Sequence, residues 1–258
     1  MCEPPHAGPK KMTPSTDEQF AVFRFSVRDL KNVHRDFRDY FVAGSLAANG
    51  ISCYRIFNIL EKIHDREPED SFMDVRQLQI VKAGIARIVE FNTLTNQFLG
   101  AIRKTFPEDR AKYAKAYAPV AKRIGSAHWA IRVRNKITHH YDMDWIENCL
   151  KHIDRNMELK FALGEKQGHS AFHFAETISI LEIMRHSGEE NPRKVMDKMF
   201  DFYNKSSSEC IDYFHFFCSE IFERYGLASK REFVTPLGES VGKHDLPNLP
   251  LFLATNKG

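Results

Sequence analysis

The spacing of apolar residues constrains the fold most strongly, because apolar side chains recur every three or four positions over most of the chain. Between residues 193 and 225 this spacing produces an aromatic stripe. Its members are Phe200, Tyr203, Cys210, Phe214, Phe217, Ile221 and Tyr225. A stripe of this kind is typical of a helix face that packs into a core. The pattern therefore predicts a mostly helical protein with little or no sheet.

Prolines, glycines and helix-capping residues divide the rest of the chain into further helices. Ser15 and Thr16 resemble capping residues and predict a helix that runs to the mid-forties, where Gly44 and Gly50 loosen it. Pro107 and Pro119 each predict the start of a helix. The other predicted helices are 51–63, 75–103, 145–153, 172–185 and 193–225. Residues 157–163 alternate in polarity, which leaves a short β-hairpin near 157–168 open.

These elements predict an all-α helical bundle with a C-terminal helical extension. The proline-rich residues 1–14 should form a disordered arm. The bundle itself is expected at 15–155, the helical extension that packs on it at 156–225, and an irregular tail at 226–258.

Two features bear on where the chain functions. It has five cysteines and no C-x-x-C spacing. We expect Cys53, Cys149 and Cys210 to be buried as small apolar groups in a reduced, cytoplasmic protein. The N-terminus lacks the apolar segment of a secretory signal, and no later stretch is apolar enough to cross a membrane.

Charge is distributed unevenly along the chain. The formal net charge is only +3, yet residues 101–140 contain ten Lys and Arg against two acidic residues, a local balance of +8 that leaves −5 elsewhere. A basic segment within a slightly acidic chain favours a phosphate-bearing partner such as RNA or a nucleotide. A solvated helix face is the alternative interpretation.

The basic segment ends in a motif of the form R-N-x-x-x-H-x-Y, made by Arg134, Asn135, His139 and Tyr141. On a regular helix Asn135 and His139 share a polar flank, so the amide can orient the imidazole. His140 falls on the apolar stripe of Trp129, Val133 and Ile137, which predicts a packing role. Arg134 and His139 lie about 140° apart on such a helix, so one ideal helix does not aim both at one phosphate.

This motif resembles that of the HEPN superfamily of helical domains, which carry R-x(4 to 6)-H with a polar residue, often Asn, after the Arg. HEPN toxins paired with minimal nucleotidyltransferase antitoxins carry R-x4-H-x-Y, and all four positions match here. The resemblance covers about half of the chain. It implies a homodimer whose two motif helices surround one cleft, and metal-independent cleavage of RNA to a 2′,3′-cyclic phosphate.

Within that resemblance, His139 would act as general acid or base, Arg134 would stabilise charge on the phosphate, and Asn135 would orient the site. Tyr141 and His140 are candidates for lining the site or for modification. The residues expected to bind RNA phosphates are Arg132, Lys136, Arg123 and Lys122.

Other functions remain open at this point. The chain could be a non-catalytic helical module that binds a nucleotide, RNA or an acidic protein, or a toxin whose Tyr141 is modified by an antitoxin or another regulatory protein. We expect no metal site and no cofactor. His169 and His173 lack the neighbouring Glu of a zinc helix, and the Glu61–His64 pair occurs only once, whereas a di-iron bundle needs two.

Overall fold

The computed structural model of the chain describes residues 20–64, 71–138, 143–152, 154, 156–157, 173–227 and 231–234. The chain divides into two compact units, Val33–Ile221 and a smaller one that joins Met1–Asn32 to Phe222–Gly258. The predicted arm at 1–14 lies outside the described residues, as does the possible hairpin near 157–168 apart from its first residue. The expected all-α bundle is confirmed.

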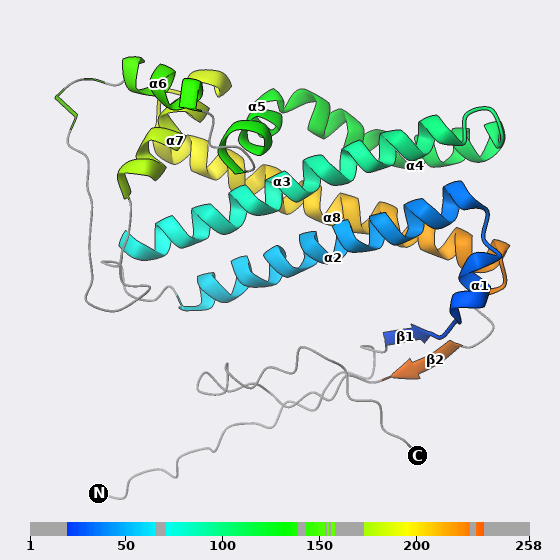
Figure 1. The fold of residues 1–258 in the computed structure, drawn as a ribbon. Coiled ribbons are helices and arrows are strands. Elements are labelled where there is room, and N and C mark those ends of the chain that lie inside the picture. The colour runs from blue at the N-terminus through cyan, green and yellow to red at the C-terminus, as the bar shows by residue number, and fades with distance from the viewer. Residues whose placement is uncertain are drawn as a thin grey trace, which may run out of the picture. The chain divides into compact units, whose positions relative to one another are not determined.

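Four long helices build the larger unit: α2 (Arg35–His64), α3 (Ser71–Ala101), α4 (Pro107–Ser126) and α8 (Pro192–Arg224), of which the last three residues of α8 belong to the smaller unit. In Figure 1 these helices run beside one another along the length of this unit. Aromatic side chains of α8 pack against rings of α2, α3 and α4. Phe217 meets Tyr40 of α2 and Phe98 of α3, with ring centroids 4.8 and 5.3 Å apart, while Tyr213 meets Tyr117 of α4 at 4.8 Å.

The aromatic stripe on α8 is part of this core, as its spacing predicts. Tyr203, Cys210, Phe214, Phe217 and Ile221 are all buried. α8, from the helical extension that the sequence predicted to pack on the bundle, lies within the same compact unit as α2 and α3. The reason is that its apolar face fills the space between the other three long helices rather than covering their outside.

Two predicted helix boundaries are wrong. α2 continues through Gly44 and Gly50 because Gly44 lets the Phe214 ring approach its backbone, where a Cβ would overlap the ring. α4 continues through Pro119, so only Pro107 begins a helix, in the first turn. The buried side chains Tyr113, Tyr117, Val120 and Ile124 hold α4 on the core on both sides of Pro119. Packing thus outweighs the hydrogen bond that the proline cannot make.

The described residues of the larger unit also form three shorter α-helices: α5 (His128–Arg132), α6 (Met143–His152) and α7 (His173–Ser187). A π-helical turn, η1 (Val133–Thr138), follows α5 directly. The predicted helices at 145–153 and 172–185 are confirmed as α6 and α7. Cys149 and Cys210 are buried as expected, but Cys53 is exposed because it lies on the outer side of α2.

The smaller unit contains β1 (Phe20–Phe23), α1 (Val27–Lys31) and β2 (Arg231–Val234). β1 and β2 pair antiparallel, with Phe20 opposite Val234. The prediction of one helix from Ser15 is therefore wrong for these residues, and part of the expected irregular tail is a strand. The capping box belongs to Ser26 and Asp29, so the first helix begins only at Val27. The segment FAVF before it has the aromatic and β-branched residues that favour a strand.

Candidate nucleic-acid site on the motif segment

The motif lies on a segment whose winding changes from residue to residue. α4 ends at Ser126, the backbone of Ala127 is not helical, and α5 and η1 follow. The apolar stripe of Trp129, Val133 and Ile137 therefore does not lie on one regular helix, because Trp129 belongs to α5 and the other two residues to η1. Trp129, Ala130 and Val133 are buried and anchor the segment, with the Trp129 ring edge-on to Phe202 of α8 at 5.1 Å.

A π-helical turn at the motif changes the relation between Arg134 and the residues after it. Such turns hydrogen-bond residue i with residue i+5, are rare, and are often found at functional sites. Positions five apart therefore lie closer to one side of the segment than they would on an α-helix. The described turn ends at Thr138. His139, His140 and Tyr141 lie outside the described residues, and the side chain of Lys136 is not described.

Arg134 and Asn135 are joined within this turn. One terminal nitrogen of the half-buried Arg134 guanidinium donates to the amide oxygen of Asn135 at 2.9 Å. The Nε atom of Arg134 is buried and has no hydrogen-bond partner. Because a buried donor without a partner costs free energy, this guanidinium is suited to donate to an anionic oxygen.

Arg132, at the end of α5, meets a cluster of charged side chains on α7. Its guanidinium lies 2.9 Å from Nε2 of His186, and the same ring nitrogen lies 2.6 Å from Oε1 of Glu182. Arg185 donates to that carboxylate oxygen at 2.9 Å. The side chain of Glu182 is only 5% exposed, whereas that of Arg185 is 44% exposed.

The electrostatics of this cluster centre on Glu182. Burial raises the pKa of its carboxyl, but the hydrogen bonds and charges of Arg185 and His186 outweigh that effect, so the pKa lies below its ordinary value. Burial and the neighbouring Glu182 raise the pKa of the Cys149 thiol to about 12. Glu182 is therefore an anion and Cys149 a neutral thiol near pH 7, which argues against a nucleophilic cysteine here.

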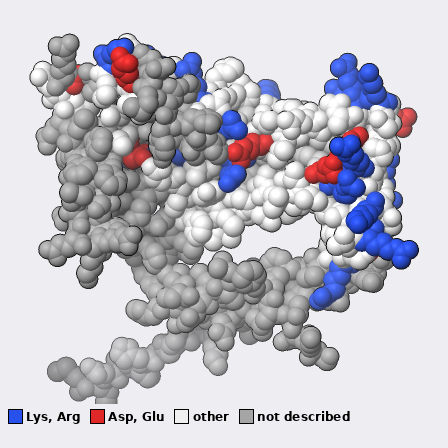
Figure 2. All heavy atoms as spheres, in the orientation of Figure 1, with Lys and Arg blue, Asp and Glu red and all other residues white. Residues whose placement is uncertain are grey.

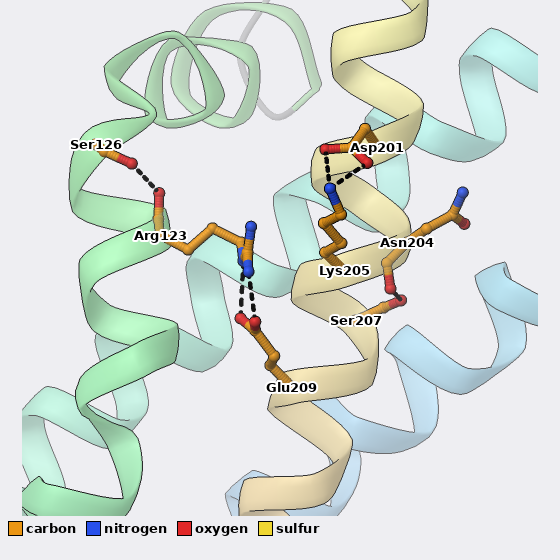
Figure 3. A network of polar contacts seen from close by, with 7 residues as sticks. All are labelled: Arg123, Ser126, Asp201, Asn204, Lys205, Ser207 and Glu209. Atoms are coloured by element: carbon orange, nitrogen blue, oxygen red, sulfur yellow. Dashed lines mark hydrogen bonds and ion pairs between the residues drawn. The ribbon is translucent and has the colours of Figure 1, made fainter.

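Two more of the predicted phosphate-binding residues lie on α4. Arg123 makes two parallel hydrogen bonds to Glu209 of α8, at 2.9 and 2.6 Å (Figure 3). This pairing holds the pKa of Arg123 above its ordinary value and fixes its guanidinium to α8. Lys122 is exposed. Figure 2 shows Lys and Arg side chains gathered over the α3–α4 turn, the segment that contains the exposed Arg103 and Lys104.

The structure thus brings Arg132 together with Glu182, Arg185 and His186, residues that the sequence reasoning had not selected. Their spacing is a usable signal, because Glu182 is three residues before Arg185 and four before His186 on one helix. Their approach to Arg132 depends on tertiary packing of α7 against α5. No local pattern in the sequence encodes that approach.

A separate groove of about 310 Å³ lies between α2 and α3. None of the motif residues lines it. Arg35, Asp36, Asp39 and Gln97 form its polar rim, over a floor that includes Tyr40 and Phe98. Asp39 is paired with Arg35 and Arg38.

The described residues contain no cluster of His, Cys, Asp and Glu that could hold a metal ion. Among the helices within that part of the chain, none is both long and apolar enough to cross a membrane. Comparison of the chain with models of known protein families, with curated proteins and with solved structures finds no match.

Proposed function

We propose that this protein is a HEPN-like, metal-independent endoribonuclease that uses Arg134, Asn135 and His139. The observation that carries the proposal is the π-helical turn over the motif. On an α-helix Arg134 and His139 would diverge by about 140°. The proposal extends the i to i+5 winding of η1 by one residue, which would turn position 139 toward the side of Arg134. Both groups of one chain would then serve the same phosphate.

The chemistry needs a proton acceptor, a proton donor and a cation. His139 takes the proton of the ribose 2′-hydroxyl while the 2′-oxygen attacks phosphorus. The bond from phosphorus to the 5′-oxygen breaks, the leaving oxygen receives a proton, and a 2′,3′-cyclic phosphate remains. The Arg134 guanidinium stabilises the negative charge that develops on the phosphate oxygens. Its contact with Asn135 fixes one side of the guanidinium and leaves the Nε proton for the substrate.

The same proposal includes a homodimer. In a two-fold assembly each chain contributes the same surface, so two copies of the motif segment face one shared cleft. This cleft then contains two copies of Arg134 and two of His139. One imidazole supplies the base and the other supplies the acid. A cytoplasmic location, expected from the free thiols, is part of this proposal.

A second candidate function is favoured by Arg123. Its two hydrogen bonds to Glu209 show that part of the basic segment holds the bundle together and is not free for phosphate. The protein would then be a non-catalytic helical module whose remaining cations bind RNA or a nucleotide.

A third candidate function keeps the toxin activity and adds a partner protein that modifies Tyr141. Mass spectrometry of the co-expressed pair tests it, and a Tyr141 that stays unmodified contradicts it.

An RNA-cleavage assay in EDTA separates nuclease from binding module. The purified chain is incubated with cellular RNA beside Arg134→Ala and His139→Ala. We expect the wild type to leave cyclic phosphate ends and each variant to be about 10²- to 10⁴-fold slower. His152→Ala and Arg193→Ala are matched controls, because both residues are exposed and lie outside the motif and the basic segment. Intact RNA that the wild type nevertheless binds would overturn the nuclease and support the module.

A further inference from the structure

The cluster where α7 meets the motif segment has more cationic groups than carboxylates. Arg132 and Arg185 are both positive, Glu182 is negative, and His186 lies between them. Each guanidinium has five N–H donors. One terminal nitrogen of Arg132 lies against His186, and one terminal nitrogen of Arg185 donates to Glu182. Most of their donors therefore remain available to a ligand.

Nε2 of His186 contacts both Glu182 and Arg132, and it cannot satisfy both groups. A ring nitrogen can make only one in-plane hydrogen bond, as a donor or as an acceptor. Glu182 is ionised and can only accept, so Nε2 of His186 must donate to it over the 2.6 Å contact. Arg132, 2.9 Å from the same nitrogen, then faces a donor and gains no acceptor from His186. An anionic oxygen placed beside both groups would satisfy the guanidinium.

Burial makes the cluster rigid. Glu182 has a side chain that is 5% exposed and fixes Arg185 and His186 from one oxygen. The side chain of His186 is 22% exposed, and Arg132 is an exposed residue, so a ligand can approach from solvent. Arg185, which the buried carboxylate orients, therefore loses little conformational entropy when it binds an anion.

We propose that Arg132, Arg185 and His186, assembled on Glu182, form a phosphate-binding subsite for the RNA backbone beside the motif. Arg132 is one residue before η1, so the subsite adjoins the segment that carries Arg134. A phosphate oxygen accepts from Arg132 and Arg185, as planar guanidinium groups favour. The subsite is independent of cleavage and serves a nuclease and a non-catalytic RNA-binding module equally.

The test measures binding of a fluorescent single-stranded oligoribonucleotide whose 2′-hydroxyls are methylated, so that it cannot be cleaved. Anisotropy titrations in EDTA at several salt concentrations compare the wild type with Arg132→Ala and Arg185→Ala. We expect each variant to bind about tenfold more weakly. The slope of log affinity against log salt should fall by about 0.7 for each phosphate that the variant no longer binds. Arg193→Ala is the control, because Arg193 is exposed on α8.

Further variants separate specific binding from simple loss of charge. Arg132→Lys and Arg185→Lys keep the positive charge but lose the paired N–H donors of the planar guanidinium. We therefore expect these variants to recover only part of the affinity that the alanine variants lose. Circular dichroism checks that every variant is folded. Wild-type affinity and salt slope in both alanine variants would overturn the subsite, and so would a wild type that does not bind the probe.

Two additional measurements separate the subsite from the proposed nuclease activity and from binding of smaller phosphates. Cleavage of unmodified RNA is measured in parallel; a chain that binds through Arg132 and Arg185 without cleaving RNA supports the subsite and contradicts the nuclease. If the chain cleaves RNA and both alanine variants bind the probe with wild-type affinity, the result supports the nuclease and contradicts the subsite.

Competition with pyrophosphate distinguishes free phosphates from backbone phosphates. If pyrophosphate displaces the probe from the wild type but not from Arg132→Ala, the subsite is open to free phosphates. If pyrophosphate does not displace the probe, while binding of the probe still depends on Arg132, the subsite binds backbone phosphates.

Discussion

Lys82 and Glu176 form an ion pair that is almost completely withdrawn from water. Their charged atoms are 2.6 Å apart, and their side chains are 5% and 10% exposed. Gln79 also donates to the same carboxylate, so α3 holds the first turn of α7 at two points. The pair positions the helix that carries Glu182, Arg185 and His186. A defect here should therefore affect the proposed phosphate subsite indirectly.

Removing one partner of this pair should be costly. Lys82→Met leaves Glu176 as a buried charge without its cation, and we expect the free energy of unfolding to fall by about 3–5 kcal/mol. The double variant Lys82→Met with Glu176→Leu removes both charges and should recover most of that loss. Urea denaturation followed by circular dichroism measures both. A single variant as stable as the wild type would show that the pair does not contribute to stability.

Glu182 predicts a specific dependence of stability on pH. Its pKa is lower in the folded chain than in the unfolded one, so its contribution is fully present above the ordinary value of about 4.3. The contribution disappears as the pH falls through the lower, folded value. Glu182→Gln should therefore cost about 1–3 kcal/mol at neutral pH, and the difference from wild type should shrink below about pH 4.

Denaturation at a series of pH values checks this prediction. Glu190→Gln is the control, because Glu190 is exposed and lies beyond the end of α7. A difference between Glu182→Gln and wild type that stays constant down to acid pH would exclude ionisation of Glu182 as its source.

Helix packing depends on two glycines that allow rings to approach a backbone. A Cβ at Gly44 would overlap Phe214, and one at Gly84 would overlap Tyr203, both buried side chains of α8. Gly44→Ala and Gly84→Ala should each lower the free energy of unfolding by about 1–3 kcal/mol through overpacking. Gly100 and Gly125 also lie in helices but have no such neighbours within 4 Å. Their alanine variants should be neutral or stabilising by up to about 1 kcal/mol. Thermal unfolding distinguishes the two pairs, and equal effects in all four variants would contradict the close approach.

Periodicity predicts helices well where a single buried face determines them. α3, α6, α7 and α8 follow from apolar spacing because local winding and core packing agree. Gly44 and Pro119 mislead the prediction because each is a local helix breaker that tertiary packing overrides. The strand at Phe20–Phe23 depends on pairing with Arg231–Val234, more than two hundred residues away in sequence.

The candidate site shows the same division between local and distant information. Arg134 and Asn135 are adjacent, so the motif predicts their proximity. The π-helical turn changes their relation to later residues without any marker in composition. The approach of Arg132 to His186 joins residues 54 positions apart and requires the packed bundle. Sequence reasoning therefore selects the motif segment but misses the α7 cluster that adjoins it.

At the scale of the whole molecule, the bundle holds the motif segment from two directions. Trp129 and Val133 are buried on the core side, with α8 supplying Phe202 against the Trp129 ring. On the other side, α5 packs against α7. A segment anchored in this way can present Arg134 and Asn135 with little loss of conformational entropy on binding. The proposed two-fold cleft needs this rigidity, because two segments must face one substrate.

Mixed dimers test that shared cleft directly. Arg134→Ala and His139→Ala chains, co-expressed with different affinity tags and purified through both, form an assembly in which one intact Arg134 and one intact His139 face the same cleft. Each parent dimer lacks one of the two groups entirely and should be about 10²- to 10⁴-fold slower than wild type. The mixed dimer keeps one imidazole and one guanidinium in the shared cleft, so we expect it to be faster than both parents. It should stay slower than wild type, because the second imidazole that completes the acid–base pair is missing. Light scattering confirms that two chains are present. A mixed dimer as inactive as its parents would place Arg134 and His139 of each chain in separate sites and contradict the shared cleft, while leaving cleavage by the single chain in force.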